Sequence, residues 1–439
     1  MFYDQFIVKG INKGVNRKAL NRVGNILKFY YCYEKQANKQ TSKQANKLVK
    51  FLTFLLITFL FYNCESEVVD ENEFLAPGSF VNELTQNEDD FGGGGSGGNV
   101  GYTSTTGIWT TDYVYNSGWR VNKHPRIVAD VNGDGKGDIV AFDNNNVKVS
   151  LSNGSNFLSD QVWYSGNYCE NHNYRTYLNP RTVADVNGDG KEDLVIFGDD
   201  NVFVSLSDGT KFLPGQTWCN GYGVGSYLIQ NWRVDKNPRV MADVNGDNKA
   251  DIIGFGNNAV YVSLSTGSSF QNGTIWNTGF VQNQNWKVDK HPRTVADVNG
   301  DGKADIVAFG SNDVWVSLSN GSSFNQDQIW KSSEYVENQN WKVYKNPRML
   351  SDVNGDGKAD IVAYGDYDVW VALSNGNGFG NGQVWYNGYG YGGGFFGAIT
   401  ARKWEVNKNP RLAEDVDGDG KGDIIGFGDN DVWVTTSKF

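Results

Sequence analysis

Residues 286–330 of the chain read WKVDKHPRTVADVNGDGKADIVAFGSNDVWVSLSNGSSFNQDQIW. Three runs in this segment favour β-strands: Arg293 to Asp297, Asp305 to Phe309, and Val314 to Ser319. The third run alternates apolar residues with a period of two, which is the spacing of a strand with one buried face. A fourth strand ends at Trp330, after a tight turn. The segment therefore predicts a unit of four antiparallel strands.

The same pattern recurs six times along the chain, with spacings of 54 to 63 residues. Its core is D-V-[ND]-G-D-[GN]-K-x-D, and the six copies begin at Asp130, Asp185, Asp243, Asp297, Asp352 and Asp415. Repeated four-stranded units are typical of a propeller, in which each unit forms one blade. We therefore expect an all-β fold, a β-propeller of six four-stranded antiparallel blades, with seven blades as the alternative.

The two ends of the repeat region predict that the propeller is a closed ring. The last copy stops at Phe439, after its third strand, so its fourth strand is missing. The segment Gly107-Ile108-Trp109 has the same x-[IV]-W form as the fourth strands elsewhere, and it precedes the first copy. This N-terminal strand can complete the last blade, which would leave no open sheet edge.

The repeated loop between the first and second strands carries regularly spaced oxygen ligands. In the fourth copy, Asp297, Asn299, Asp301 and Asp305 occupy positions 1, 3, 5 and 9. Carboxylate and amide oxygens at alternating positions wrap one Ca²⁺, and a main-chain carbonyl at position 7 usually adds a further ligand. Gly302 at position 6 permits the sharp bend that such a loop needs. The loop therefore predicts a calcium site.

All six loops fill these four positions, which indicates about one Ca²⁺ per repeat in a structural role. Magnesium is less suitable because it prefers a smaller octahedral shell. An EF-hand is excluded because its position 12 requires Glu, whereas here that position is Ala308. The predicted ligands are Asp130, Asn132, Asp134, Asp138, Asp185, Asn187, Asp189, Asp193, Asp243, Asn245, Asp247, Asp251, Asp297, Asn299, Asp301, Asp305, Asp352, Asn354, Asp356, Asp360, Asp415, Asp417, Asp419 and Asp423.

A Phe-Gly pair or its variant follows the second strand of each copy. The pairs are Phe197-Gly198, Phe255-Gly256, Phe309-Gly310 and Phe427-Gly428, with Tyr364-Gly365 in the fifth copy and Phe142-Asp143 in the first. Together with the loops, this pattern resembles FG-GAP/VCBS repeats, as in integrin α-subunit propellers and secreted bacterial and fungal proteins. The Lys-His-Pro-Arg and V-x-V-S-L stretches are similar to the fungal lectins of the Psathyrella velutina type. The resemblance covers about 330 residues and implies binding of N-acetylglucosamine.

A lead-in segment before each first strand places an aromatic residue, then His or Asn, then Pro-Arg. The candidate ligand-binding residues are Trp119, His124, Tyr174, Asn179, Trp232, Asn237, Trp286, His291, Trp341, Asn346, Trp404 and Asn409. An aromatic face beside amide or imidazole donors suits a sugar. In the alternative interpretation, the aromatic residues pack between blades and the following arginines bond to main-chain carbonyls or loop carboxylates. The tryptophans that end the fourth strands are predicted to pack between blades.

The N-terminal part of the chain predicts an export signal. Phe51 to Tyr62 is an apolar run of twelve residues, which is too short for a membrane span, and lysines precede it as in a secretory signal. The following Cys64 resembles the lipidated cysteine of a bacterial lipoprotein, with ordinary cleavage nearby as the alternative. We therefore divide the chain into a basic head and signal peptide (1–63), an acidic, Gly-rich flexible linker (64–100) and the propeller (101–439). The expected location is the outer membrane or cell surface, or the medium if the protein is secreted.

Charge and motifs narrow the possible functions. Residues 1–50 contain 11 Lys and Arg against two acidic residues, whereas the whole chain carries a net charge of −11, so the rest is strongly acidic. An acidic body repels phosphate, which argues against nucleic-acid binding. From residue 101 onward the sequence contains no G-x-S-x-G, no H-E-x-x-H and no phosphate loop. We therefore expect a binding protein without enzymatic activity, and a polysaccharide-degrading enzyme is the less favoured alternative.

Two partner classes remain open for a monomeric binding domain of this kind. The first is a glycan or a surface glycoprotein bound at several equivalent sites. The second is a protein partner in adhesion, because the long segments Asn220 to Gln230 and Asn387 to Ala401 break the symmetry of one rim. Contact with a membrane is expected only through a lipid on Cys64. Finally, Cys169 and Cys219 follow fourth strands of neighbouring blades, and an oxidising compartment predicts a disulfide between them.

Overall fold

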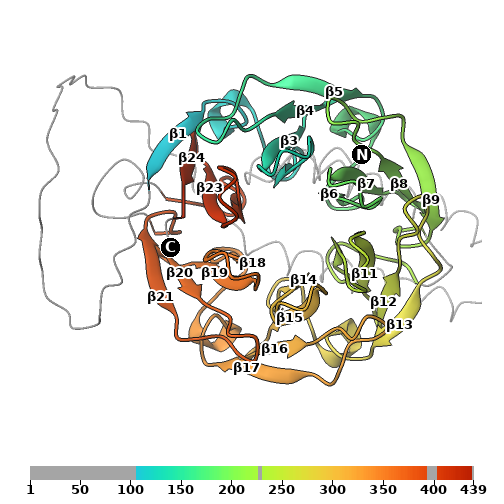
Figure 1. Cartoon of the computed structure of the whole chain (residues 1–439), viewed down its shortest axis with the longest axis vertical. Helices are drawn as coiled ribbons and strands as arrows, with labels where there is room; N and C mark the ends of the chain where they lie inside the picture. Colours follow the sequence, from blue (N-terminus) through green and yellow to red (C-terminus); the bar gives the residue numbers. More distant parts are fainter. Residues whose placement is uncertain (1–104, 226–229, 393–402, 438–439) are drawn as a thin grey trace, which may run out of the picture. The chain divides into compact units, whose positions relative to one another are not determined.

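The computed structural model describes residues 105–225, 230–392 and 403–437. These residues form six antiparallel sheets of four strands each, arranged around a central axis (Figure 1). The prediction of an all-β, six-bladed propeller is confirmed, and the seven-bladed alternative is wrong. Within the described ranges, no helix is long and apolar enough to cross a membrane.

The blades follow one another along the chain. Blade 1 contains β2 (Arg126–Ala129), β3 (Asp138–Phe142), β4 (Asn146–Ser150) and β5 (Gln161–Ser165); blade 2 contains β6 (Arg181–Ala184), β7 (Asp193–Phe197), β8 (Asn201–Ser205) and β9 (Gln216–Asn220); blade 3 contains β10 (Arg239–Ala242), β11 (Asp251–Phe255), β12 (Val260–Ser263) and β13 (Thr274–Asn277). Blade 4 contains β14 (Arg293–Ala296), β15 (Asp305–Phe309), β16 (Asp313–Ser317) and β17 (Gln328–Ser332); blade 5 contains β18 (Arg348–Ser351), β19 (Asp360–Tyr364), β20 (Asp368–Ala372) and β21 (Gln383–Asn387); blade 6 contains β22 (Arg411–Glu414), β23 (Asp423–Phe427), β24 (Val432–Thr435) and β1 (Thr106–Thr110).

The strands of blade 4 match the runs predicted from residues 286–330. All five residues of β15 are buried, since this strand has a neighbouring blade on each face. In β16 buried and half-buried residues alternate, with Val314 and Val316 buried, as the period of two predicted. The outermost pairing, β16 with β17, shifts register between Val314 and Trp315. Such a bulge bends the outer strand and increases its twist.

The N-terminal strand closes the ring, as predicted. Strand β1 lies antiparallel to β24, with Gly107 opposite Val434 and Ile108 opposite Trp433, and Figure 1 shows β1, β24 and β23 side by side in one blade. The Trp109 carbonyl accepts a hydrogen bond from the Phe157 amide of blade 1 at 3.3 Å. Blade 6 is therefore built from both ends of the propeller, which removes the exposed edge that a linear array would have.

Six hydrophobic cores lie between neighbouring blades. In the core between blades 4 and 5, Trp330 packs edge-on against Phe379 with ring centroids 5.5 Å apart. Including this one, a Trp–Phe contact is found at five of the blade boundaries. The tryptophans that end the fourth strands are 4–8% exposed: Trp109, Trp163, Trp218, Trp276, Trp330 and Trp385. Their predicted role in blade packing is confirmed.

The Pro-Arg and Phe-Gly motifs meet across each blade boundary. In blade 4, Nη1 of Arg293 donates to the Phe280 carbonyl at 2.9 Å, and the guanidinium lies 5.6 Å from the ring centroid of Phe255 in blade 3. Burial lowers the pKa of Arg293 to about 10, and the aromatic face offsets part of the cost of burying the cation. The same contacts recur for Arg126, Arg181, Arg239, Arg348 and Arg411. The predicted bond to main-chain carbonyls is therefore confirmed.

The antiparallel order of each blade gives the ring two distinct faces. The turn after the first strand and the turn after the third strand lie at the same end of the sheet. We call this end the loop face, because it carries the aspartate-rich loops. The turn after the second strand and the lead-in segments lie at the opposite end, which we call the lead-in face. The residues of the two predicted classes of site therefore lie on opposite faces.

The two cysteines of the propeller are free. Cys169 is fully buried in the core between blades 1 and 2, whereas Cys219 packs against the core between blades 2 and 3. The predicted disulfide is therefore wrong, because the strands direct the two thiols into different cores. Burial raises the pKa of both thiols to about 12, which keeps them protonated at neutral pH. Cys64, the signal peptide and the linker lie outside the described residues.

Candidate functional sites on the two faces of the ring

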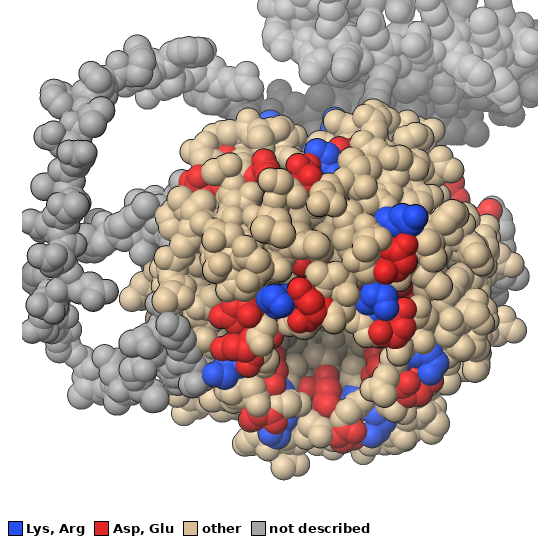
Figure 2. Space-filling model, turned by 45° about the horizontal axis from the view of Figure 1, so that its top comes forward, with Lys and Arg blue, Asp and Glu red and all other residues tan. Residues whose placement is uncertain are grey.

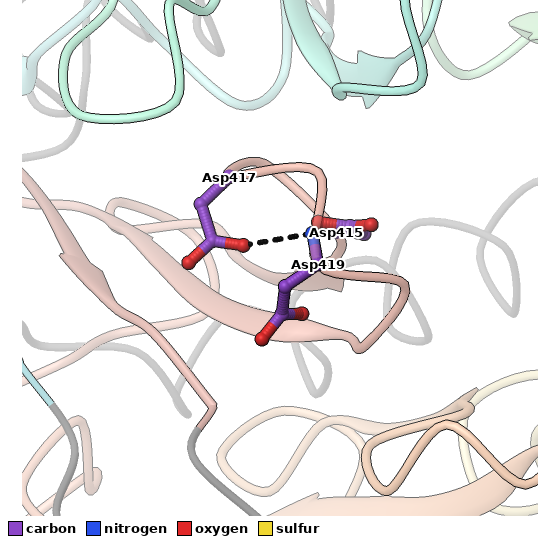
Figure 3. Close-up of side chains that lie close together, drawn as sticks. All are labelled: Asp415, Asp417 and Asp419. Atoms are coloured by element: carbon purple, nitrogen blue, oxygen red, sulfur yellow. Dashed lines mark hydrogen bonds between the residues drawn. The ribbon is translucent and has the colours of Figure 1, made fainter.

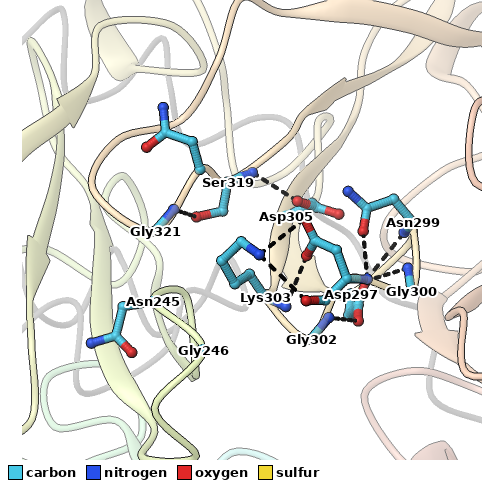
Figure 4. A network of polar contacts seen from close by, with 12 residues as sticks. Asn245, Gly246, Asp297, Asn299, Gly300, Gly302, Lys303, Asp305, Ser319 and Gly321 are labelled. Atoms are coloured by element: carbon cyan, nitrogen blue, oxygen red, sulfur yellow. Dashed lines mark hydrogen bonds and ion pairs between the residues drawn. The ribbon is translucent and has the colours of Figure 1, made fainter.

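The aspartate-rich loops fold their acidic side chains inward over their own backbone (Figure 4). In the fourth loop, Oδ1 of Asp297 accepts hydrogen bonds from the amides of Gly300 and Asp301 at 2.6 and 3.3 Å, and Oδ2 accepts from Gly302 at 2.7 Å. Oδ1 of Asn299 accepts from the Asp301 amide at 2.9 Å. Positions 1, 3 and 5 of the predicted metal site are thus drawn together in one turn.

The aspartate at position 9 lies beneath this turn and is fully buried. Oδ2 of Asp305 accepts from the Val298 amide at 3.3 Å, and Oδ1 accepts from the Ser319 amide at 2.7 Å. The Ser319 hydroxyl then donates to the Val244 carbonyl of blade 3 at 2.6 Å. Burial raises the pKa of Asp305 to about 7. Position 9 therefore anchors the loop to two strands and, through Ser319, to the preceding blade, a role that sequence reasoning missed.

The lysine at position 7 links each loop to its neighbour. Nζ of Lys303 lies 3.1 Å from Asp301 Oδ2, and the lysine stem lies against Gly246 of the preceding loop, where an added Cβ would come within 3.2 Å. The Ala304 amide also donates to the Asp243 carbonyl of that loop at 2.8 Å. Repeated six times, these contacts form a ring of linked loops. Figure 2 shows acidic side chains gathered around a central hollow, with basic side chains beside them.

The sixth loop has an additional carboxylate. Here position 3 is Asp417 instead of Asn, and ligand oxygens of Asp415, Asp417 and Asp419 all lie within 4.8 Å of one another (Figure 3). Burial, and then the neighbouring charge of Asp419, raise the pKa of Asp417. Lys421 is 3.9 Å from Asp419, whereas the equivalent pairs in the other loops are 3.0–3.2 Å apart. Clustered hard oxygens of this kind fit a calcium-sized cation, although Asp423 at position 9 is not part of the group.

On the lead-in face, the six aromatic residues differ in exposure. Trp119, Tyr174, Trp286 and Trp341 are half-buried, whereas Trp232 and Trp404 are 0% and 1% exposed. Trp286, for example, packs edge-on against Phe280 and His291 at centroid distances of 5.2 and 5.4 Å. The aromatic residues therefore support the lead-in segment in all six blades, and four of them also keep part of the ring at the surface.

The predicted His and Asn ligands close the lead-in turn. Nδ1 of His291 accepts from the Lys287 amide at 3.3 Å, and Nε2 bonds to Ser311 Oγ at 3.0 Å. In blade 5, Oδ1 of Asn346 accepts from the Lys342 amide at 3.2 Å, and Nδ2 donates to the Tyr364 carbonyl at 3.0 Å. Nδ2 of Asn346 also donates to Asp366 Oδ1 at 3.4 Å, at the position equivalent to Ser311. His and Asn interchange because each accepts from the same lead-in amide and bonds to the same turn position.

All six of these turn residues are buried: His124, Asn179, Asn237, His291, Asn346 and Asn409 are 1–8% exposed. In the described structure their polar atoms bond within the protein, so any ligand contact would have to come from the surfaces around them. Three pockets lie beside them, and one of about 300 Å³ is lined by His124, Pro125, Asn179 and Pro180, among others. The other two each contain one of the lead-in aromatic residues. One, of about 300 Å³, is lined by Tyr174, Asn179, Asp199 and Phe203 in blade 2. The other, of about 220 Å³, is lined by Trp404, Asn409 and Asp429 in blade 6, among others.

Each lead-in segment crosses the turn that follows the second strand of the preceding blade, and we call this crossing a junction. A further polar feature occurs at the junctions. At four junctions a short 3-10 helix carries an exposed Asn that donates Nδ2 to the Oδ1 of an exposed Asn in that turn. The helices are η1 (Tyr115–Ser117), η2 (Glu170–His172), η3 (Gln282–Gln284) and η4 (Glu337–Gln339). The amide pairs are Asn116–Asn430, Asn171–Asn145, Asn283–Asn258 and Asn338–Asn312. The recurring sequences YNSGW, ENHNY, QNQNW and ENQNW, which end at the lead-in aromatic residue, are the signal that sequence reasoning missed.

A closed ring of six similar four-stranded blades places the chain in the class of six-bladed β-propellers. No protein-family model and no curated protein matches the sequence. Among solved structures, a lectin from Agrocybe aegerita, described as specifically recognising non-reducing terminal N-acetylglucosamine, is 34% identical with a TM-score of 0.58; the match covers 72% of this chain and 78% of the lectin chain. At this identity and coverage, the chain belongs to the same protein family as that lectin.

A Tc holotoxin pore from Photorhabdus luminescens is also similar, with 14% identity and a TM-score of 0.53. That match covers 76% of this chain but 14% of the toxin chain. At such low identity the likeness shows a shared propeller fold and nothing about function.

Proposed function

We propose that this protein is a carbohydrate-binding β-propeller without enzymatic activity, and that its lead-in face binds sugars of the N-acetylglucosamine type. The observation that carries the proposal is the family relationship to the Agrocybe aegerita lectin over 72% of the chain. The repeats, in this proposal, are of the FG-GAP/VCBS type. A glycan or a surface glycoprotein is the partner.

The chemistry of the lead-in face supports this proposal. Pockets there combine an aromatic residue with amide and carboxylate groups, as Tyr174, Asn201 and Asp199 do in blade 2. Sugars have an apolar ring face and a rim of hydroxyls, so they suit an aromatic surface beside convergent polar groups. Each small site would bind weakly, and several on one ring would gain avidity towards a surface that displays many sugar ends.

The test of the proposed function is a glycan array probed with the full-length mature protein, followed by binding measurements with free N-acetylglucosamine and glucose. We expect binding to glycans with terminal N-acetylglucosamine and competition by N-acetylglucosamine but not by glucose. If no glycan binds, the carbohydrate proposal is wrong. Retention of the protein on cells stripped of glycans would then favour the adhesion alternative.

We also propose that calcium stabilises the ring. The residues that would hold it are those at positions 1, 3, 5 and 9 of each loop, together with the position-7 carbonyl. A divalent cation would neutralise the carboxylates that each loop brings together, which include three within 4.8 Å in the sixth loop. Because a ligand that binds only the folded state stabilises it, excess chelator should lower the melting temperature by many degrees, and added Ca²⁺ should restore it more effectively than Mg²⁺. A melting curve that does not respond to chelator would refute this proposal.

The N-terminal residues support a proposal about location. We propose that the protein is exported, with the apolar run at residues 51–62 as signal and Cys64 as the lipidated residue of a surface lipoprotein. A surface anchor would present all sugar sites of the ring on the same side of the cell envelope. Substitution of Cys64 by Ser should release the protein from the membrane fraction without changing its sugar binding. Membrane association that survives the substitution would contradict lipidation at Cys64.

A further inference from the structure

The sixth aspartate-rich loop differs from the other five at position 3, which is Asp417 here and Asn in all the others. Oδ1 of Asp417 accepts a hydrogen bond from the position-5 amide at 3.1 Å. The Asn at position 3 of the other loops accepts the same bond at 2.8–2.9 Å. The aspartate therefore keeps the shape of the turn, but it replaces an NH₂ group, which cannot bind a cation, with a second charged oxygen.

The aspartate at position 1 also has fewer internal bonds in the sixth loop. In the other five loops, its Oδ1 accepts from the amides at positions 4 and 5. In the sixth loop, Oδ1 of Asp415 accepts from the Gly418 amide at 2.7 Å, and the Asp419 amide bonds to Asp417 but not to Asp415. Within the described residues, three acidic, His or Cys side chains bring ligand atoms within 4.8 Å of one another only here (Figure 3).

The sixth loop also belongs to the blade that closes the ring. The loop ends at Asp423, whose Oδ1 accepts from the Ser437 amide at 2.7 Å. The preceding residue, Thr436, donates its amide to the Thr105 carbonyl at 3.0 Å, and Thr105 leads directly into β1. Two consecutive residues thus connect this loop to the N-terminal strand. In the other blades, all four strands come from one stretch of the chain.

The same loop is bonded to the first blade. The Ser152 hydroxyl donates to the Val416 carbonyl at 2.6 Å, and the Gly137 amide donates to the Asp415 carbonyl at 2.7 Å. The loop is therefore held between blade 1, which follows β1 in the chain, and the end of β24, which pairs with β1. These bonds link the order of the sixth loop to closure of the ring.

Charge makes the sixth loop the one that most needs a cation. It has carboxylates at positions 1, 3, 5 and 9, whereas each other loop has three carboxylates and one amide at these positions. Like charges in one turn repel one another, so the added carboxylate destabilises this loop when no cation is bound. The affinity of a loop for Ca²⁺ depends on the number of its charged ligands, so the same carboxylate favours binding.

We propose that Asp417 makes the sixth loop the tightest calcium site of the ring, and that occupation of this site holds the N-terminal strand in the last blade. This inference rests on the calcium proposal above and adds an order to the six sites. A ligand that binds the ordered loop stabilises the contacts that the loop makes. The first Ca²⁺ to bind would therefore secure ring closure, and the other five would stiffen blades that are already complete.

Calcium titration of the metal-free, full-length mature protein, by calorimetry and native mass spectrometry, tests the order of the sites. We expect one Ca²⁺ to bind at least tenfold more tightly than the other five. Asp417→Asn, which copies the other loops, should remove the tight site. Asn299→Asp, the reverse change in the fourth loop, is the matched variant and should add a second tight site.

Hydrogen exchange at one equivalent of Ca²⁺ tests the link to ring closure. In the parent, exchange of the main-chain amides of β1 and β24 should slow at least tenfold relative to the metal-free protein. In the variant that combines Asp417→Asn with Asn299→Asp, the tight site lies in the fourth loop, so one equivalent should change exchange in β1 less than twofold. The combined variant has as many carboxylates as the parent and so controls for total charge.

Each outcome decides one part of the inference. Six equal sites in the parent, or a tight site that survives Asp417→Asn, would overturn it and leave the calcium proposal standing. Equal protection of β1 in the parent and the combined variant would overturn the link to closure. If Asp417→Asn does not fold, the number of tight sites in Asn299→Asp decides the order of the sites. If the parent binds no Ca²⁺, the calcium proposal and this inference both fail.

Discussion

The two faces of the ring differ in how many of the six blades make the same contacts. On the loop face, the same contacts recur in all six blades: a buried position-9 aspartate, a serine bonded to the preceding blade and a lysine over the preceding loop. On the lead-in face, four junctions carry an amide pair and two are filled by other residues. Interactions that hold every blade to the next must be kept everywhere, whereas exposed ones can be lost at some blades.

This difference has a physical basis in where each bond lies. The loop-face bonds cross blade boundaries in buried surroundings, and an unpartnered polar group there costs about 1–3 kcal/mol. The amide pairs are exposed, and water replaces a lost bond at little cost. Mutations on the two faces should therefore have separate effects, on stability for the loop face and on binding for the lead-in face.

The largest expected effect concerns the ring itself, on which both faces depend. Deletion of residues 101–112 removes β1 and exposes the edge of β24, so we expect aggregation or loss of cooperative unfolding. The single change Trp109→Ala should cost about 4 kcal/mol because the side chain is 8% exposed and packs on Phe157. The neighbouring Ile108, which is 46% exposed, is the matched control, and its change to Ala should cost less than about 1 kcal/mol. Equal unfolding free energies for the two variants would contradict ring closure by β1.

The next largest effect concerns the stability cost of changes at opposite ends of β15: at Asp305, its first residue, and at Asn312, in the turn that follows it. Asp305→Ala on the loop face leaves two buried amides, Val298 and Ser319, without their acceptor, and should cost about 3 kcal/mol. Asn312→Ala on the lead-in face should cost less than about 0.5 kcal/mol. Urea unfolding in the presence of chelator measures both without a contribution from metal. Similar losses of unfolding free energy in the two variants would contradict the view that the loop face contributes more to stability than the lead-in face.

A smaller effect should appear within the loop itself. Gly300 and Gly302 both have φ of +80°, but a Cβ at Gly300 would lie 3.2 Å from Lys358 of the next loop, whereas a Cβ at Gly302 would meet nothing within 4 Å. Asn248 already occupies the position of Gly302 in the third loop, with φ of 62°. We expect Gly302→Asn to cost less than about 1 kcal/mol and Gly300→Asn about 2 kcal/mol. Thermal melts of both variants check this, and the reverse order would show that the lysine contact is unimportant.

The smallest expected effect is the contribution of the two histidine blades to the pH dependence of stability. Burial lowers the pKa of His124 and His291 below the ordinary value of 6.5. A group with a lowered folded pKa binds fewer protons in the folded state, so its stabilisation is present above pH 6.5 and is lost as the pH falls below it. His291→Asn, which copies blades 2, 3, 5 and 6, leaves the buried position-9 aspartates unchanged, so its melting temperature at pH 5 relative to pH 7 should be higher than that of the parent. An unchanged pH profile in the variant would show that His291 does not contribute to it.

The repeat explains why so much of the fold could be predicted. One copy predicted the strands at 293–296, 305–309 and 313–317 to within a residue or two, and five further copies confirmed the pattern. The closure by Gly107 to Trp109 followed from the missing strand of the last copy. The disulfide prediction was wrong because the sequence positions of Cys169 and Cys219 do not reveal which core each thiol enters.

The candidate sites were predicted less completely than the fold. The sequence identified the loop residues as a set, but not that Asp305 is buried beneath the loop and bonded to two strands. It identified the lead-in motif, but gave no sign that His291 and Asn346 bond within the turn. The amide pairs were missed because their members lie in different blades, 25 or 26 residues apart in three pairs and 314 residues apart in the pair Asn116–Asn430.

The sequence by itself determined the number of blades, the order of strands and the oxygen-rich loops, because these depend on local periodicity and on a spacing that repeats along the chain. The tertiary structure alone decided which of the repeated polar residues face solvent and which bond inside the ring. Repeated residues look equivalent in sequence, but Trp232 is fully buried and Trp286 is not. The reason is that exposure depends on the strand beside each ring: Trp232 lies over Gly254, where an added Cβ would collide with the ring, whereas the fourth blade has Ala308 at that position. This contact exists only in the folded ring.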